Sequence, residues 1–170
     1  MAVFSAYNHD QLIEFLKENA PHAEIHVDDD VSAKHSANGK AQDMISGQIL
    51  AYVAVGDVDD IRGVLKTAQK FHIAVVPQTA DTSTVVGADG IDGAIILSVA
   101  KLNHIKEINK DDSLAVVEPG VINQDLDKAA RKQGMFYAPD PASKPISAIG
   151  GNVSTNAGGL SGVRYGATKD

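Results

Sequence analysis

A glycine-rich segment near the C-terminal end is the part of this sequence best suited to binding chemistry. Residues 148–159 read AIGGNVSTNAGG, in which paired glycines stand beside small hydroxyl and amide side chains. Where no Cβ stands in the way, a flat or anionic ligand can approach the backbone N–H groups closely. The same composition is typical of a surface turn, so the residues alone leave both interpretations open. The spacing matches neither a Walker loop nor a Rossmann fingerprint, which argues against nucleotide binding by those two routes.

A second candidate binding segment follows a predicted βαβ unit. The apolar run at 49–55 predicts a buried strand, and the run at 73–76, which ends at Pro77, predicts another. Between them, Asp57 is expected to cap a helix. The apolar stripe of this helix is Val58, Ile61, Val64, Leu65, Ala68 and Phe71. A strand, a helix and a strand at this spacing predict parallel strands with a right-handed crossover, so the loop after the second strand is a natural ligand site.

The remaining elements are predicted from apolar patterning and from residues that begin or end helices. Residues 22–48 are polar and are expected to form extended segments and exposed loop. The other predicted elements are a helix over 10–19 capped by Asn8 and stopped by Pro21, strands over 94–99 and 114–117 around a polar turn at 109–113, and a helix capped by Asn123 and stopped by Gly134.

One group of side chains has residue types that bind metal ions. His22, Glu24 and His26 alternate, so on an extended segment they would share one face, with Asp28 next in line. Three or four ligands on a single strand rarely converge on one ion, and the polar context favours solvated side chains. The sequence therefore predicts no metal site.

Composition excludes several classes of protein. The 170 residues contain no cysteine, which rules out a disulfide scaffold, a thiolate metal site and a cysteinyl cofactor link. The net charge of −7 and the scattered lysines and arginines argue against nucleic acid as a partner. No apolar run approaches the roughly 18 residues of a membrane-spanning helix, and the first ten residues lack the pattern of a secretion signal. These features predict a cytoplasmic protein.

Several segments, taken in order, resemble one family. They are IAVVPQTADTST, AIILSVAKLNHI, AVVEPGV, PDPAS and AIGGNVSTNAGGLSGVRYGATKD, and they fall between Ile49 and Asp170. Each segment is weak alone, but their order and spacing are specific. The sequence resembles the PCMH-type FAD-binding domain of FAD-linked oxidases of the vanillyl-alcohol oxidase type, and is similar to the branch that contains D-lactate dehydrogenases and the glycolate oxidase FAD subunit.

The resemblance implies an α+β fold with two small sheet-and-helix subdomains, the first containing the βαβ unit and the second incomplete. Residues 1–48 would form an N-terminal helix and polar segment, and residues 49–170 the FAD-binding domain. The chain would be an inactive fragment of an enzyme that oxidises a small 2-hydroxy acid, such as D-lactate or glycolate, by hydride transfer to flavin. An apolar face that later strands would cover would favour self-association.

The resemblance also assigns cofactor-binding residues, but no catalytic residue. Backbone N–H groups of the loop after the βαβ unit would wrap the pyrophosphate of FAD, and this loop comprises Pro77, Gln78, Thr79, Ala80, Asp81, Thr82 and Ser83. The residues that would line the flavin and its ribityl chain are Pro119, Gly120, Pro141, Ala142, Ser143, Ile149, Gly150, Gly151, Asn152, Asn156 and Gly158. Covalent flavin links in this family use a histidine or a cysteine, and residues 77–83 contain neither. The FAD is therefore expected to be non-covalent.

The pyrophosphate loop departs from the family pattern. Relatives usually have P-R-G-x-G-T-S, whereas this chain has PQTADTS, without the arginine and the two glycines. The carboxylate of Asp81 about 4 Å from a phosphate charge would cost roughly 4 kcal/mol at an effective dielectric constant of about 20. Alternatively, Asp81 adopts the left-handed backbone of the missing glycine and turns its side chain to solvent. We expect FAD binding that is retained but weakened; the alternative is a non-catalytic scaffold of the same fold.

Overall fold

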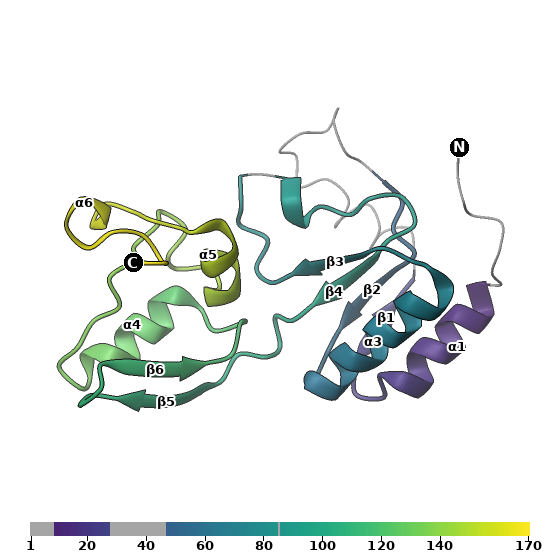
Figure 1. Cartoon of the computed structure of the whole chain (residues 1–170), viewed down its shortest axis with the longest axis horizontal. Coiled ribbons are helices and arrows are strands. Elements are labelled where there is room, and N and C mark those ends of the chain that lie inside the picture. The colour runs from purple at the N-terminus through teal and green to yellow at the C-terminus, as the bar shows by residue number, and fades with distance from the viewer. Residues whose placement is uncertain (1–8, 28–46, 85) are drawn as a thin grey trace. The chain divides into compact units, whose positions relative to one another are not determined.

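The computed structural model describes residues 9–27, 47–84 and 86–170, which fall into two compact units (Figure 1). The first unit takes in the described residues up to Gln78 together with Thr84–Val99. The second unit takes in Thr79–Ser83 together with Ala100–Asp170. The chain thus enters the second unit for the five residues Thr79–Ser83, returns to the first unit, and passes into the second unit again after Val99.

The first unit is built on a mixed sheet of four strands. The strands are β1 (Glu24–His26), β2 (Ala51–Ala54), β3 (Val75–Gln78) and β4 (Ile95–Ser98), in the spatial order β1-β2-β4-β3. β4 is parallel to both β2 and β3, whereas β1 is antiparallel to β2. The predicted strands are therefore present and parallel, with β4 lying between the two strands of the βαβ unit. All four β4 side chains are buried, as expected for a strand with neighbours on both sides.

Helices α1 (His9–Asn19) and α3 (Val58–Phe71) lie side by side in the first unit (Figure 1). The predicted stripe of α3 is only partly correct, because Val64 and Ala68 are buried but Val58 and Leu65 are 53% and 48% exposed. The buried face instead includes Gly63, whose missing side chain lets the end of α1 approach: a Cβ there would stand 1.8 Å from the Asn19 carbonyl oxygen.

The predicted start of α3 is confirmed. The Asp57 side chain accepts a hydrogen bond of 2.8 Å from the backbone N–H of Asp60, which satisfies one of the free donors of the first turn. At the other end, His72 takes the left-handed backbone that often closes a helix. The proposed cap of α1, Asn8, lies outside the described residues.

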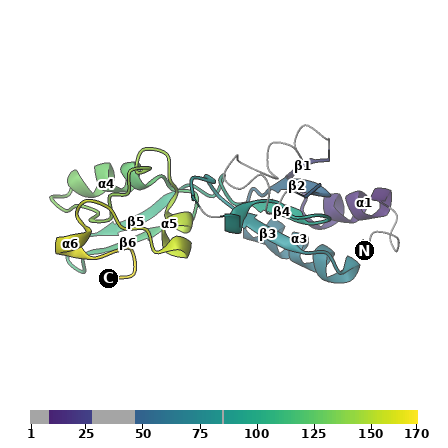
Figure 2. The same ribbon diagram turned by 90° about the horizontal axis from the view of Figure 1, so that it is seen from above.

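The second unit combines a β-hairpin with short helices. Its elements are β5 (Ile105–Asn109), β6 (Leu114–Val117), α4 (Asn123–Arg131), α5 (Ile149–Thr155) and α6 (Gly162–Tyr165). Figure 2 shows α4 running alongside the hairpin. Strand β5 was not predicted, because its sequence IKEIN carries too few apolar residues to stand out. Its antiparallel pairing with β6, from Ile105 opposite Val117 to Asn109 opposite Leu114, identifies this segment as a strand.

The predicted cap of α4 is wrong. Ile122 occupies the cap position, and Asn123 is the first helical residue, fully buried. Its side-chain Nδ2 donates to the Pro139 carbonyl oxygen at 3.2 Å, so tertiary contact rather than capping explains this asparagine. The apolar core beside it is small, with Val121, Leu126 and Ile149 at its centre. None of the helices in the described part of the chain is long and apolar enough to cross a membrane.

Candidate functional site

The loop that follows β3 begins later than predicted. Pro77 and Gln78 lie in the strand, not in the loop. Pro77 is tolerated there because β3 is at the edge of the sheet, where a missing N–H breaks no ladder on the open side. The Gln78 side chain is 3% exposed and its Nε2 donates to the Ala88 carbonyl oxygen at 3.0 Å. The part of the predicted pyrophosphate loop that is loop therefore runs from Thr79 to Ser83.

Asp81 sits at the middle of this loop with a φ of 50°. This φ agrees with the alternative in which Asp81 takes the left-handed backbone of the missing glycine. Aspartate tolerates this region better than most residues, so the loop keeps a sharp turn without the family's glycine. Its neighbours Thr79, Thr82 and Ser83 are half-buried, and they bring hydroxyl groups to the same loop.

The AIGGN segment was expected to be a loop, and it is instead the start of α5. The N–H of Ile149 donates to Val121 O, and that of Gly150 donates to Pro119 O, both at 2.8 Å. A Cβ on Gly150 would stand 2.8 Å from Pro119 Cβ, closer than real Cβ atoms approach. Glycine at this position is what lets the first turn of α5 press against the turn at Pro119.

The turn at Pro119 and Gly120 is itself held by close backbone contact. Gly120 donates its N–H to Leu102 O at 2.7 Å, and a Cβ on Gly120 would stand 2.5 Å from Ala100 O. No side chain larger than hydrogen fits there without displacing backbone. The turn at Pro119 and Gly120, the backbone of residues 100–102 and the start of α5 are therefore fixed relative to one another within the second unit.

Gly151 is where the loop after β3 meets α5. A Cβ on this residue would stand 3.3 Å from the hydroxyl oxygen of Thr79. The two segments lie more than 70 residues apart in sequence and belong to the same compact unit. The structure thus brings together three groups of predicted site residues: the loop at 79–83, the turn at 119–120 and the glycines of α5.

The other predicted residues lie along the chain on either side of α5. Pro141 O accepts the N–H of Lys144, and Ser143 O accepts the N–H of Ser147, which makes a compact turn before the helix. Asn156 ends α5 in the left-handed conformation with a φ of 50°. Gly158 follows it in open surroundings, since a Cβ on this glycine would come no closer than 3.9 Å to another heavy atom. Ala142 is exposed.

Two buried polar atoms beside these segments have no hydrogen-bond partner among the described residues. Asn152 is 3% exposed, yet its Nδ2 donates to nothing, and the Ser147 hydroxyl is likewise unpaired. Leaving a buried donor unpaired costs about 1–3 kcal/mol, so few such atoms occur in native structures. An unused amide donor next to Gly151 and a hydroxyl-lined loop suits a ligand rich in oxygen acceptors, such as a dinucleotide. The residues therefore fit FAD, although no basic side chain is present in the loop.

Glu118, directly before the turn, was not recognised from the sequence. Its Oε2 accepts hydrogen bonds from the backbone N–H of His104 at 3.0 Å and lies 2.9 Å from the His104 ring Nδ1, while Lys106 Nζ is 3.2 Å from Oε1. The backbone N–H of His104 is the main cause that lowers the pKa of Glu118 to about 2. This carboxylate fixes the end of β6 to the start of β5 and so supports the Pro119 turn.

His22, Glu24 and His26 are expected to share one face of an extended segment, but only Glu24 and His26 lie on a strand. Glu24 and His26 are exposed on β1, while His22 precedes the strand and places its Nδ1 2.8 Å from Asp57 Oδ2. The buried Asp60 accepts the backbone N–H of His22 at 3.1 Å. The backbone N–H of Asp60, with a smaller contribution from His22, lowers the pKa of Asp57. This cluster secures the start of α3. Asp28 lies outside the described residues.

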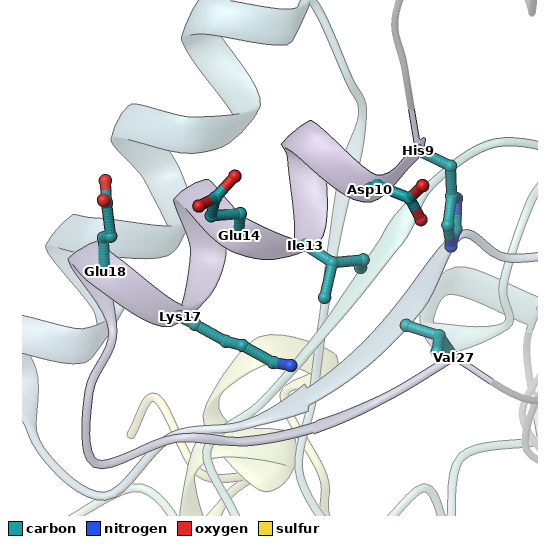
Figure 3. Close-up of a pocket in the computed structure, with 7 residues that line it drawn as sticks. All are labelled: His9, Asp10, Ile13, Glu14, Lys17, Glu18 and Val27. Carbon is teal, nitrogen blue, oxygen red and sulfur yellow. The ribbon is translucent and has the colours of Figure 1, made fainter.

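An open depression of about 550 Å³ lies along α1 in the first unit (Figure 3). Its lining side chains are mostly charged and point outward from one helix, and Val27 closes its far side. It contains no glycine-rich backbone and none of the residues predicted to bind a cofactor. The candidate site is therefore the group of segments around Gly151, not this depression.

Comparison with known proteins gives one family and many relatives. A family model described as an FAD binding domain matches residues 49–170. Glycolate oxidase subunit GlcD of Bacillus subtilis is 38% identical over 120 residues, which cover 71% of this chain and 26% of the relative. A D-lactate dehydrogenase of Anaerostipes hadrus is 35% identical over 162 residues, which cover 94% of this chain and 33% of the relative. The chain thus spans about a quarter to a third of their length.

Among solved structures, 4-ethylphenol oxidase from Gulosibacter chungangensis superimposes with a TM-score of 0.79 over 94% of this chain and 31% of that one. The sequence identity is 21%, so this likeness shows the fold alone. It confirms the predicted α+β fold class.

Proposed function

Because the chain belongs to the family of FAD-binding domains, we propose that it supplies the cofactor-binding part of an oxidoreductase that oxidises a small 2-hydroxy acid. The observation that carries this proposal is the meeting of Thr79 with Gly151, next to the unpaired Nδ2 of buried Asn152. Glycine backbone, hydroxyl donors and a free amide donor gather there from distant parts of the sequence. The FAD supplies the hydride acceptor that such an oxidation needs.

The residues of the loop are proposed to bind the pyrophosphate. Backbone N–H groups and the hydroxyls of Thr79, Thr82 and Ser83 would donate to its oxygens, a role that needs no basic side chain when several donors act together. Gly150 and Gly151 would keep the surface of α5 open for close approach. The segments at 141–143 and 156–158, together with the Pro119 turn, would line the flavin end.

Attachment of FAD is proposed to be non-covalent. Residues 77–83 contain no histidine, and the chain has no cysteine, so the side chains that form flavin links in this family are missing at the matching position. Acid precipitation of the FAD-loaded protein should therefore release all of its flavin into the supernatant. Flavin that stays with the precipitate would contradict this part of the proposal.

The substrate class rests on the relatives. Glycolate oxidase and D-lactate dehydrogenase both act, by their names, on small 2-hydroxy acids, and they match 71% and 94% of this chain. The matched region corresponds to the FAD-binding part, and we assign no catalytic residue within it. Substrate choice is therefore proposed to depend on groups beyond the segments described above.

A scaffold that has lost FAD is the second candidate, and Asp81 is the observation that favours it. Its carboxylate lies in the loop that would wrap two phosphate charges, where the family pattern has glycine. Titration of the 170-residue chain with FAD, followed by flavin fluorescence, separates the candidates. Saturable binding supports the flavoprotein, and a flat titration supports the scaffold.

A domain exchange tests the complete proposal. Residues 49–170 would replace the matching segment of the Bacillus subtilis glycolate oxidase subunit, with the unaltered relative as the control. We expect the hybrid to hold flavin and to have that flavin bleached by glycolate under anaerobic conditions. A folded hybrid that binds no flavin contradicts the proposed cofactor role, whereas one that binds flavin without bleaching by any 2-hydroxy acid contradicts the substrate class alone.

A further inference from the structure

We propose that Asp140 is a positioning residue that holds together two segments of the candidate site, the proline segment (residues 139–143) and the glycine loop (residues 156–161). This inference rests on the proposed function, because its consequence is a defined shape for the flavin end of the site. Asp140 itself was not among the residues predicted to bind a cofactor. It lies between Pro139 and Pro141, where an acidic residue is easily taken for a solvated turn residue.

The carboxylate of Asp140 makes a two-point contact with Ser161. Its Oδ1 accepts the backbone N–H of Ser161 at 2.9 Å, and its Oδ2 accepts the Ser161 hydroxyl at 3.0 Å. Two hydrogen bonds from one residue to both carboxylate oxygens fix the orientation as well as the distance. The backbone N–H of Ser161 is the main cause that lowers the pKa of Asp140, so the acceptor is ionised at neutral pH.

Gly159 brings the backbones of the two segments into direct contact. Its φ is 153°, a conformation that side chains rarely allow. A Cβ there would stand 2.2 Å from Asp140 O and 2.4 Å from Asp140 Oδ1. The glycine loop therefore passes over Asp140 at a distance that only glycine permits, and the two hydrogen bonds to Ser161 follow directly after this approach.

Each of the two segments is also hydrogen-bonded to another part of the second unit, and Asp140 links the segments to each other. The proline segment is tied to α4, because Asn123 Nδ2 donates to Pro139 O at 3.2 Å. The start of the glycine loop is tied to the C-terminal residues, because Thr168 donates to Ala157 O through its N–H at 3.0 Å and its hydroxyl at 2.7 Å. Between these anchors, Asp140 is what joins one segment to the other.

Apolar packing does not hold the glycine loop. Leu160 is 94% exposed, and Val163 just beyond the loop is fully exposed. With no buried side chain to fix it, the loop depends on polar contacts for its position. Removal of the Asp140 carboxylate should therefore loosen the loop while the rest of the unit stays folded.

The test measures FAD binding by the full 170-residue chain and three variants. Asp140→Ala removes both acceptors, Asp140→Asn keeps an acceptor for the Ser161 N–H, and Ser161→Ala removes only the hydroxyl. We expect the dissociation constant to rise about tenfold, to stay within about twofold, and to rise about threefold, respectively. Asp125→Ala is the matched control, because this exposed aspartate contacts only Lys128 among the described side chains, and it should bind like the unaltered chain.

Hydrogen exchange without FAD provides a second readout. Asp140→Ala should speed amide exchange in residues 157–161 and leave exchange in α4 unchanged. In a separate measurement with FAD bound to this variant, the visible absorption band of the flavin should lose part of its fine structure. If Asp140→Ala fails to fold, Ser161→Ala decides by the same two measurements.

Each outcome has one meaning. No FAD binding by the unaltered chain overturns the proposed function and this inference with it. Binding that is equal in the unaltered chain, Asp140→Ala and Ser161→Ala overturns the positioning role alone. Equal losses in Asp140→Asn and Asp140→Ala also overturn it, because they would indicate that the charge, not the hydrogen-bonded geometry, affects FAD.

Discussion

The first unit has the larger apolar core, whereas the second unit has a small one and relies more on its carboxylates. Leu12, Leu16 and Ile96 in the first unit are completely buried, and most of the buried apolar side chains among the described residues belong there. In the second unit, large apolar residues such as Ile146 and Leu160 are exposed. Since burial of apolar area is the main source of stability, the second unit must obtain its order differently.

Three carboxylates in the second unit each accept the backbone N–H of a loop residue. Glu118 and Asp140 do so as described above, and Asp127 accepts the N–H of Tyr137 at 3.0 Å. Burial works to raise the pKa of Asp127, but hydrogen bonds from Lys144, Tyr137 and Arg131 lower it overall. Carboxylates of the first unit also accept backbone N–H groups, as Asp60 does from His22, but there they act beside a larger apolar core. The candidate site lies in the unit whose loops have directional polar contacts and little apolar burial to place them. Such contacts set geometry closely and respond to charge and pH.

The largest effect is expected from the apolar core of the first unit. Ile96→Ala removes a fully buried side chain from the central strand β4 and should lower the free energy of unfolding by about 2–5 kcal/mol. The matched control Leu65→Ala, at a site that is 48% exposed on α3, should change it by less than about 0.5 kcal/mol. Urea unfolding followed by circular dichroism measures both. Equal losses would mean that burial does not distinguish these positions.

A glycine in the second unit should give the next largest effect. Gly120→Ala forces a Cβ against backbone at 2.5 Å and should cost about 1–3 kcal/mol, because Ala100 O cannot rotate away as a side chain would. Gly162→Ala is the matched control, since a Cβ there meets nothing within 4 Å and the residue begins helix α6. It should be neutral or stabilising by up to about 1 kcal/mol. Thermal unfolding of the two variants compares them, and a neutral Gly120→Ala would contradict the tight turn.

Asp81 should affect FAD binding more than stability. Asp81→Gly relieves a left-handed backbone but makes the unfolded chain more flexible, so the free energy of unfolding should change by less than about 1 kcal/mol. Removal of the carboxylate should strengthen FAD binding about tenfold. Asp81→Asn separates the causes in the same titration, because it removes the charge and still tolerates this backbone. No gain in either variant would show that this loop does not limit binding.

The smallest effect is expected at acid pH. Glu118 has a pKa of about 2 in the folded chain against a usual value of 4.5, so it binds fewer protons when folded than when unfolded. Its contribution to stability is fully present above the usual value and disappears as the pH falls toward about 2. Glu118→Gln should therefore flatten stability against pH in this window, as measured by urea unfolding at several pH values. Glu107→Gln, at an exposed position on β5, is the matched control for removal of a glutamate charge.

Sequence predicted the local features of the fold and missed those set by distant contacts. The Asp57 cap and the buried strand β2 follow from neighbouring residues, and both were predicted. Pro77 looked like the end of a strand because nothing local reveals that β3 is an edge strand. Asn123 looked like a cap because its partner, Pro139 O, lies 16 residues away.

The candidate site divides in the same way. Glycines and hydroxyls at 79–83 and 150–158 could be recognised from residue type and family resemblance. Glu118 and Asp140 could not, because a loop carboxylate has the same sequence pattern whether it is solvated or accepts a distant N–H. The pairing of such a residue with a glycine in a strained conformation, as with Asp140 and Gly159, is visible only in the structure.

Hydrogen exchange with and without FAD tests most directly whether distant segments form one binding surface. We predict that FAD slows amide exchange in residues 79–83 and 149–152 together, at the same ligand concentration, with no comparable change in α1. Protection confined to one of the two segments, or protection of α1 instead, would contradict the account.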